Sequence, residues 1–161
     1  MYKKYRVLFV VAVAGVAAAC TSPAQRQREA QQSTAAPAAR AAVQPMQAEF
    51  ASSPRVPSAE GTVKTSDAGN NNTGIDVQVK HLARPQKLDP SATTYVVWAR
   101  PLGDFGRPQS LGALSVDQEL TGRLSGTTAF RDFEVFITAE SSAQVQDPRG
   151  ERLLWATVTQ R

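Results

Sequence analysis

The stretch TTYVVWAR (residues 93–100) is apolar at most consecutive positions, and DFEVFITAE (residues 132–140) alternates apolar with polar residues. A period of two is typical of a half-buried β-strand, whereas a short continuous apolar run predicts a strand that is buried on both faces. We therefore predict a mid-sheet strand at residues 93–100. In residues 132–140, four apolar side chains share the face that we expect to pack against the core: Phe133, Val135, Ile137 and Ala139.

Shorter β-rich runs lie on both sides of these stretches and are separated by turn residues. No helical period appears after residue 60. The predicted strands are residues 60–66, 75–80, 93–100, 110–116, 119–124, 132–140 and 152–159. About seven strands over about 100 residues, with turn signals between them, are typical of an immunoglobulin-like sandwich. The sequence therefore predicts an all-β fold, with a single immunoglobulin-like antiparallel β-sandwich at residues 60–161.

The segment before this domain has a different composition. Residues 20–59 are rich in Ala, Gln, Pro and Arg. Such a segment buries too little apolar surface to offset the entropy of ordering. We predict that residues 20–59 form a disordered tether. The bulky apolar residues after Cys20 in this segment are only four: Val43, Met46, Phe50 and Val56.

The first 19 residues have the three parts of a bacterial signal peptide. Lys3, Lys4 and Arg6 precede 13 uncharged, mostly apolar residues at 7–19, and small alanines lead to Cys20. This apolar run is shorter than the roughly 20 residues that a transmembrane helix needs. The pattern resembles a bacterial lipoprotein precursor, which implies cleavage between Ala19 and Cys20 and lipid attachment, as diacylglycerol and palmitate, to the Cys20 thiol.

One alternative for this leader stays open. The usual lipoprotein motif has Leu three residues before the Cys, and here that residue is Ala17. Ala17-Ala18-Ala19 also fits the site of the ordinary signal peptidase, which would cut the same bond and leave Cys20 unlipidated. Because Cys20 is the only cysteine, that product would carry an exposed, unpaired thiol in an oxidising compartment. We therefore favour lipidation.

The predicted location is the bacterial cell envelope, lipid-anchored and facing the periplasm. Thr21 follows the cysteine, where an Asp would favour retention in the inner membrane, so the outer membrane is favoured over the inner. The formal net charge of +4 falls to +1 once Lys3, Lys4 and Arg6 are removed, because 15 basic and 14 acidic residues remain. A nucleic-acid partner would need a basic face. We expect none.

Several predicted strands resemble the extracytoplasmic β-sandwich domain of anti-sigma-K factors over roughly residues 73–158. The matching features are Tyr95 with Trp98, a Gly-containing hairpin, and a strand that ends in Thr138-Ala139-Glu140 before a Pro/Gly turn. This resemblance implies a fold. It does not imply that family's regulatory activity, because the chain lacks the family's cytoplasmic sigma-binding portion and membrane-spanning helix.

Residues able to carry catalysis or bind a metal are few. His81 is the only histidine, so a Ser-His-Asp arrangement would depend on it, and zinc or copper sites need two or more His or Cys ligands. Asp132 and Glu134 share the outer face of their strand, with Glu140 at its end. A solvent-facing strand explains these acids without glycoside hydrolysis or calcium binding. We predict no catalytic residues, no cofactor and no metal.

The aromatic side chains allow two interpretations. Trp98 and Trp155, with Tyr95, Phe133 and Phe136, would form either the core or a carbohydrate-stacking platform. Core packing is the expectation, because aromatic residues dominate the cores of small β domains. Phe136 lies on the face opposite Phe133, and we predict that it is buried against a second layer.

The sequence as a whole predicts a membrane-anchored envelope lipoprotein whose β-sandwich is a binding or structural domain and not an enzyme. The expected partners are the membrane, through the N-terminal lipid, and an envelope protein or cell-wall polymer. A cell-wall or polysaccharide-binding module is the alternative, and a hydrolase is a poor third.

Overall fold

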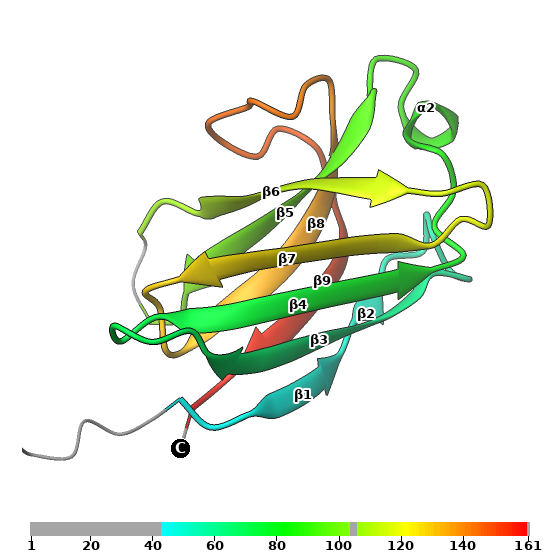
Figure 1. The fold of residues 1–161 in the computed structure, drawn as a ribbon. Coiled ribbons are helices and arrows are strands. Elements are labelled where there is room, and N and C mark those ends of the chain that lie inside the picture. The colour runs from blue at the N-terminus through cyan, green and yellow to red at the C-terminus, as the bar shows by residue number, and fades with distance from the viewer. Residues whose placement is uncertain (1–42, 104–105, 161) are drawn as a thin grey trace, which may run out of the picture. The chain divides into compact units, whose positions relative to one another are not determined.

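The computed structural model describes residues 43–103 and 106–160. Within these residues the chain forms nine β-strands and one four-residue helix, and every strand pair is antiparallel (Figure 1). The predicted all-β fold is confirmed. The elements are β1 (Met46–Glu49), β2 (Ala51–Ser52), β3 (Glu60–Asp67), β4 (Thr73–Lys80), α2 (Pro85–Leu88), β5 (Thr94–Pro101), β6 (Gln109–Val116), β7 (Gly122–Thr128), β8 (Phe133–Glu140) and β9 (Arg152–Val158).

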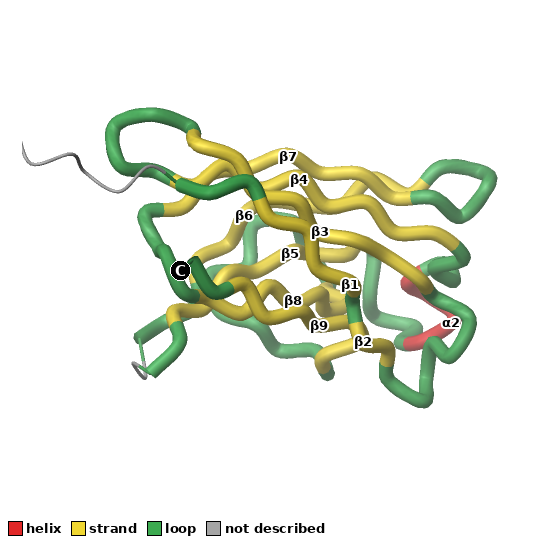
Figure 2. Tube along the Cα trace, turned by 90° about the horizontal axis from the view of Figure 1, so that it is seen from below, coloured by secondary structure: helices red, strands yellow, loops and turns green. Residues whose placement is uncertain are grey.

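The strands are hydrogen-bonded in one series, in the order β1-β3-β4-β7-β6-β5-β8-β9-β2. Strand β6 belongs to both halves of this series, because its first part pairs with β5 while Ser115 and Val116 pair with β7. We call β1, β3, β4 and β7 the β4 layer, and β5, β8, β9 and β2 the β8 layer. Figure 2 shows the two layers facing each other. The fold thus has nine strands in one nearly closed series, where about seven strands in a sandwich were expected.

The segment before residue 60 closes the other side of this series. Strand β1 pairs with β3, from Met46 opposite Thr65 to Glu49 opposite Thr62. Strand β2 then pairs with β9, with Ala51 opposite Trp155. A chain segment of seven residues therefore crosses from one layer to the other, as β6 does on the opposite side.

Phe50 is the residue at this crossing point. Its N–H donates to the Gly61 carbonyl at 2.9 Å, and its side chain is 9% exposed. A Cβ on Gly61 would lie 3.0 Å from the Phe50 ring, so the absence of a side chain at Gly61 lets the ring pack closely.

The prediction that residues 20–59 form a disordered tether is wrong for residues 43–59. Val43, Phe50 and Val56 are all buried, and Met46 packs against the core. The composition of the whole segment does not indicate that residues 43–59 are ordered, because its few bulky apolar residues are concentrated in its last 17 positions. Residues 20–42 lie outside the described residues.

The main core lies between the two layers. Tyr95, Val97 and Ala99 of β5 point into it, as do Phe133, Val135 and Ile137 of β8, and Ala139 packs against it. The predicted core face of residues 132–140 is confirmed. Strand β5 lies between β6 and β8 and is buried on both faces, as the run TTYVVWAR predicts.

Tyr95 joins this core to a loop. Its hydroxyl donates to the Ala83 carbonyl at 2.5 Å, in the connection between β4 and β5. Burial raises the pKa of Tyr95 to about 12, because the phenolate would lose its hydration in the core. Tyr95 therefore holds the residue 81–93 connection against the sheet.

A strand predicted at residues 119–124 is wrong at its start, since β7 begins at Gly122. The Asp117 carboxylate accepts hydrogen bonds from the N–H groups of Glu119 and Thr121, at 2.9 and 2.8 Å. Leu120 has a positive φ of 59°. An aspartate that bonds nearby backbone N–H groups favours a turn over a strand.

The two ends of the layers carry different segments. The described chain starts beside its C-terminal end, because the Gln44 N–H donates to the Gln160 side chain at 2.9 Å. Helix α2 lies at the opposite end (Figure 2). The segment before residue 43 therefore joins the domain at the end away from α2.

Candidate functional site

The outer faces of the two layers differ in construction. On the β4 layer, polar residues that alternate with the core positions are exposed, including Lys64, Asp76 and Arg123. This is the usual solvated face of an antiparallel sheet. On the β8 layer, the outward-facing residues Trp98, Phe136 and Glu134 are buried. The β8 layer therefore has a second set of packed and polar groups outside the main core.

The centre of this outer face is an aromatic cluster. Trp98 pairs with Phe136 across β5 and β8, and Phe136 pairs with Trp155 across β8 and β9. The rings of Trp98 and Phe136 are stacked, with centroids 6.4 Å apart and an interplanar angle of 18°. Trp98 is 0% and Phe136 3% exposed, with Val96, Val145 and Trp155 packed around them. The predicted burial of Phe136 is confirmed.

This packing argues against the alternative of a carbohydrate-stacking platform. Trp98 and Phe136 present no exposed ring face, and Trp155 is partly buried. The guanidinium of Arg152 lies 5.8 Å from the centroid of the Trp155 ring. A sugar ring that stacked on that side of Trp155 would have to displace this arginine.

An arginine–glutamate–arginine cluster covers the aromatic rings. The two oxygens of Glu134 bind Arg100 Nη2 at 2.5 Å and Arg152 Nη1 at 2.8 Å. Glu134 is nearly buried, whereas the side chains of Arg100 and Arg152 are 43% and 49% exposed. Arg100 lies 5.7 Å from the centroid of the Phe136 ring, which adds a cation–π contact. One carboxylate thus positions two guanidiniums that retain unused N–H donors toward solvent.

A second buried carboxylate fixes the loop between β8 and β9. Glu140 is 3% exposed, and its Oε1 accepts hydrogen bonds from the Thr138 hydroxyl, the Arg149 N–H and the Gly150 N–H at 2.6, 2.9 and 3.1 Å. The Trp98 indole N–H donates to the same Thr138 hydroxyl at 2.9 Å. A Cβ on Gly150 would lie 2.3 Å from the Ala139 carbonyl oxygen, so only glycine fits there.

A groove of about 460 Å³ lies between this loop and the start of β6. Its two walls are Pro108–Ser110 and Ala143–Gln146. Next to these walls, Arg107 and Asp147 join the two segments by hydrogen bonds of 3.2 and 2.6 Å. The hydrogen bonds and charge of Asp147 raise the pKa of the Arg107 guanidinium.

The predicted acidic group does not assemble into one site. Asp132 precedes β8 and accepts a hydrogen bond from the Gln160 N–H at 2.8 Å. Glu134 and Glu140 are six residues apart on one strand, which places them about 20 Å apart, beyond the range of about 5–9.5 Å between glycosidase carboxylates. Asp132 is two residues from Glu134, about 7 Å along the chain, but Glu134 is nearly buried and paired with two arginines. Each of these acids has a separate structural contact.

The remaining predicted site residues are placed as follows. His81 is exposed at the end of β4 with a positive φ of 56°, and among the described residues no serine or carboxylate is hydrogen-bonded to its ring. Within residues 43–103 and 106–160, no group of three His, Cys, Asp or Glu residues is arranged to hold a metal. Ala19 and Cys20, the predicted cleavage and lipidation site, lie outside the described residues.

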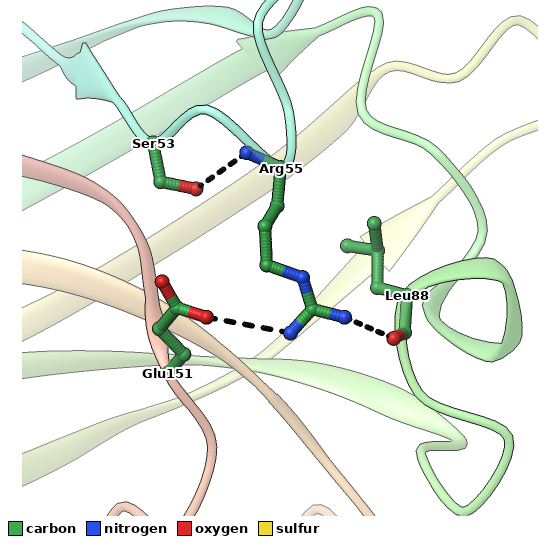
Figure 3. Close-up of polar contacts among 4 residues, drawn as sticks. All are labelled: Ser53, Arg55, Leu88 and Glu151. Carbon is green, nitrogen blue, oxygen red and sulfur yellow. Dashed lines mark hydrogen bonds and ion pairs between the residues drawn. The ribbon is translucent and has the colours of Figure 1, made fainter.

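At the α2 end, Arg55 connects three segments that are distant in sequence (Figure 3). Its guanidinium donates to the Leu88 carbonyl of α2 and forms an ion pair with Glu151 at 3.4 Å. Its N–H donates to the Ser53 hydroxyl at 3.3 Å. Nearby, hydrogen bonds from Ser91 lower the pKa of Asp89. These contacts hold loops together and present no converging reactive groups.

The fold and this face together define an all-β module with one specialised outer surface. No protein-family model matches the chain, and no curated protein is significantly similar to it. In the part of the chain that the structure describes, no helix is long and apolar enough to span a membrane.

Proposed function

We propose that this chain is a lipid-anchored protein of the bacterial cell envelope whose β domain is a non-catalytic binding module. Cys20 carries the lipid, residues 20–42 link it to the domain, and the outer face of the β8 layer binds the partner. The partner is an envelope protein or a cell-wall polymer. The proposed location is the periplasmic side of the outer membrane.

One observation supports the proposed binding role of the domain. The β8 layer holds two half-exposed arginines on a nearly buried carboxylate, over packed aromatic rings. Preorganised guanidiniums with free donors are typical of surfaces that bind anionic or polar groups. The β4 layer has the alternating exposed residues of a solvated sheet, and the groove of about 400 Å³ on it is lined in part by Lys64, Asp76 and Arg123.

The arrangement of the chain ends supports the proposed lipid anchor. The chain joins the domain at the Gln160 end, and α2 lies at the other end. The β8 layer runs along the side between these ends (Figure 2). A tether from the membrane would leave the outer face of this layer open to a partner. The resemblance to the extracytoplasmic β-sandwich domain of anti-sigma-K factors stays a prediction, at the level of the fold alone.

The anchor is tested by labelling cells with an alkyne fatty acid. We expect label on the wild-type chain and none on Cys20→Ala. An unlabelled wild-type chain would contradict lipidation, and label on Cys20→Ala would place the lipid elsewhere.

The binding face is tested by photo-crosslinking in cells. A photoreactive amino acid is placed at Gln146, beside the groove of the β8 layer, or at Ser125, on the outer face of the β4 layer. We expect a discrete crosslinked partner from position 146 and none from position 125. Crosslinks from position 125 alone would contradict the proposed face.

A further inference from the structure

The groove between the start of β6 and the β8–β9 loop has an unusual lining. Its seven residues include three glutamines and one serine, and none of the seven is charged. Amide and hydroxyl side chains act as both donors and acceptors. The remaining residues, Pro108, Ala143 and Val145, supply small apolar surface. Such a lining suits an uncharged ligand that carries many hydrogen-bonding groups.

The groove is continuous with the specialised face of the β8 layer. Ser110 pairs with Trp98, and Gln109 pairs with Ala99, the residue before Arg100. The register between β5 and β6 shifts at Val97/Trp98. Gly112 adopts a φ of 131° close to this shift. The β6 wall therefore departs from a flat sheet beside the aromatic cluster.

Both walls are held in place by contacts that are independent of any ligand. Gln109 is fixed because its Nε2 donates to the Thr127 carbonyl at 3.1 Å and its Oε1 accepts from the Thr128 hydroxyl at 2.7 Å. On the other wall, the carboxylate of Glu140 fixes the end of the loop at Arg149 and Gly150. The Arg107–Asp147 ion pair joins the two walls. A preformed groove loses less entropy on binding a ligand.

We infer that this groove binds a short, uncharged segment of a glycan, one or two sugar rings long. This inference rests on the proposed binding role of the β8 layer and names the ligand class. Its volume of about 460 Å³ is within the usual range for small-ligand sites. Sugar hydroxyls and acetamides match the side chains of Ser110, Gln144 and Gln146, and the rings match the small apolar patches. The Gln109 amide is bonded to β7 and serves to fix its wall.

Two other grooves have a different chemistry. One has a volume of about 580 Å³ beside Phe50, and its lining includes Glu49 and Lys80. The other has a volume of about 400 Å³ on the β4 layer, and its lining includes Asp76 and Arg123. Charged groups of both signs do not select an uncharged ligand. The groove between β6 and the β8–β9 loop is therefore the better glycan site.

The test uses the mature chain with Cys20→Ser and chitotetraose, an uncharged oligomer of N-acetylglucosamine, as the probe. Backbone NMR spectra are recorded during titration to about 10 mM, a range that detects millimolar affinity. We expect shifts at residues 108–110 and 143–146. The variant Ala143→Trp, which fills the groove, should abolish them, and Gln146→Ala should weaken binding about fivefold. Ser125→Ala on the β4 layer is the matched control and should bind like wild type.

Thermal unfolding shows whether each variant is folded. If Ala143→Trp does not fold, Gln146→Ala still tests the site, because it alters one exposed side chain. An absence of shifts at about 10 mM probe, or shifts outside the groove, would overturn the glycan site. If position 146 still crosslinks to an envelope protein in cells, the proposed binding face survives while the glycan assignment fails. If the probe causes no shifts in the groove and position 146 forms no crosslink, both the glycan site and the proposed binding face fail.

Discussion

At the scale of single residues, Glu134 and Glu140 show how a strand can bury charged groups on its outer face. Burying a carboxylate is costly unless it is paired or hydrogen-bonded. Glu134 is paired with two arginines, and Glu140 accepts three hydrogen bonds through one oxygen. The sequence predicts the face on which these acids lie, but the expectation that this face is solvated is wrong, since Glu134 is 7% and Glu140 3% exposed. It does not predict their partners, because Arg100, Arg152, Arg149 and Gly150 come from other strands or loops.

Glu134→Gln should destabilise the domain by about 1–2 kcal/mol, because it removes the charge that holds Arg100 and Arg152. We expect no larger loss in the free energy of unfolding, because the two arginines are half exposed and water replaces part of the interaction. Urea unfolding measures the change. Asp76→Asn, at an exposed carboxylate bound to Ser125, is the control and should change stability by less than about 0.5 kcal/mol. Equal effects at the two positions would contradict the role given to Glu134.

Tyr95 makes the stability depend on alkaline pH. Its pKa is about 12 in the folded domain against 10.0 for the ordinary value, so folding favours the protonated hydroxyl. This contribution is fully present below pH 10 and is lost as the pH rises toward 12. Absorbance of the mature chain at 295 nm should show phenolate formation near pH 12, since Tyr95 is its only tyrosine. A transition near pH 10 in folded protein would contradict the burial of the Tyr95 hydroxyl.

At the scale of elements, the closing segment is the main feature that the sequence analysis missed. The central strands are predictable because TTYVVWAR and DFEVFITAE carry strong local patterns. Residues 46–50 also alternate apolar and polar side chains, in the order Met, Gln, Ala, Glu, Phe. That alternation is short and adjoins a segment rich in Ala and Gln, so the composition favours disorder over a strand. Which edges β1 and β2 pair with is set by tertiary structure, and no local pattern encodes it.

The groove could not be predicted for a similar reason. Its walls come from the start of β6, with Pro108 before it, and from the β8–β9 loop, about 35 residues apart in sequence. Turn residues at Pro108, Pro148 and Gly150 mark these segments as loops. The hydrogen bonds of Glu140 fix the β8–β9 loop and the Arg107–Asp147 pair joins the walls, and these contacts appear only in the folded chain.

Phe50→Ala tests whether the closing segment belongs to the fold. Because Phe50 is buried where the chain crosses from β3 to β9, we expect a loss of about 3 kcal/mol in the free energy of unfolding. Gln47→Ala, at an exposed position of β1, is the control and should change it by less than about 0.5 kcal/mol. If Phe50→Ala is as stable as wild type, residues 43–59 contribute little and the domain starts near residue 60.

At the scale of the whole molecule, the domain combines a closed core with a single specialised face. Strands β6 and β1–β2 each cross between the layers, so the two sheets have few free edges, which limits edge-to-edge association. The outer face of the β8 layer is then the surface where packed aromatics, paired charges and a groove coincide. A tethered module of this kind would act by holding a partner near the membrane.

Hydrogen–deuterium exchange of the chain in its own envelope membranes, compared with the purified mature chain, tests whether the outer face of the β8 layer binds a partner. We expect slower exchange in the envelope at residues 106–111 and 141–151, with no change in the β3–β4 turn at residues 68–72. Identical exchange in both preparations, or slower exchange confined to the β4 layer, would contradict a binding face on the β8 layer.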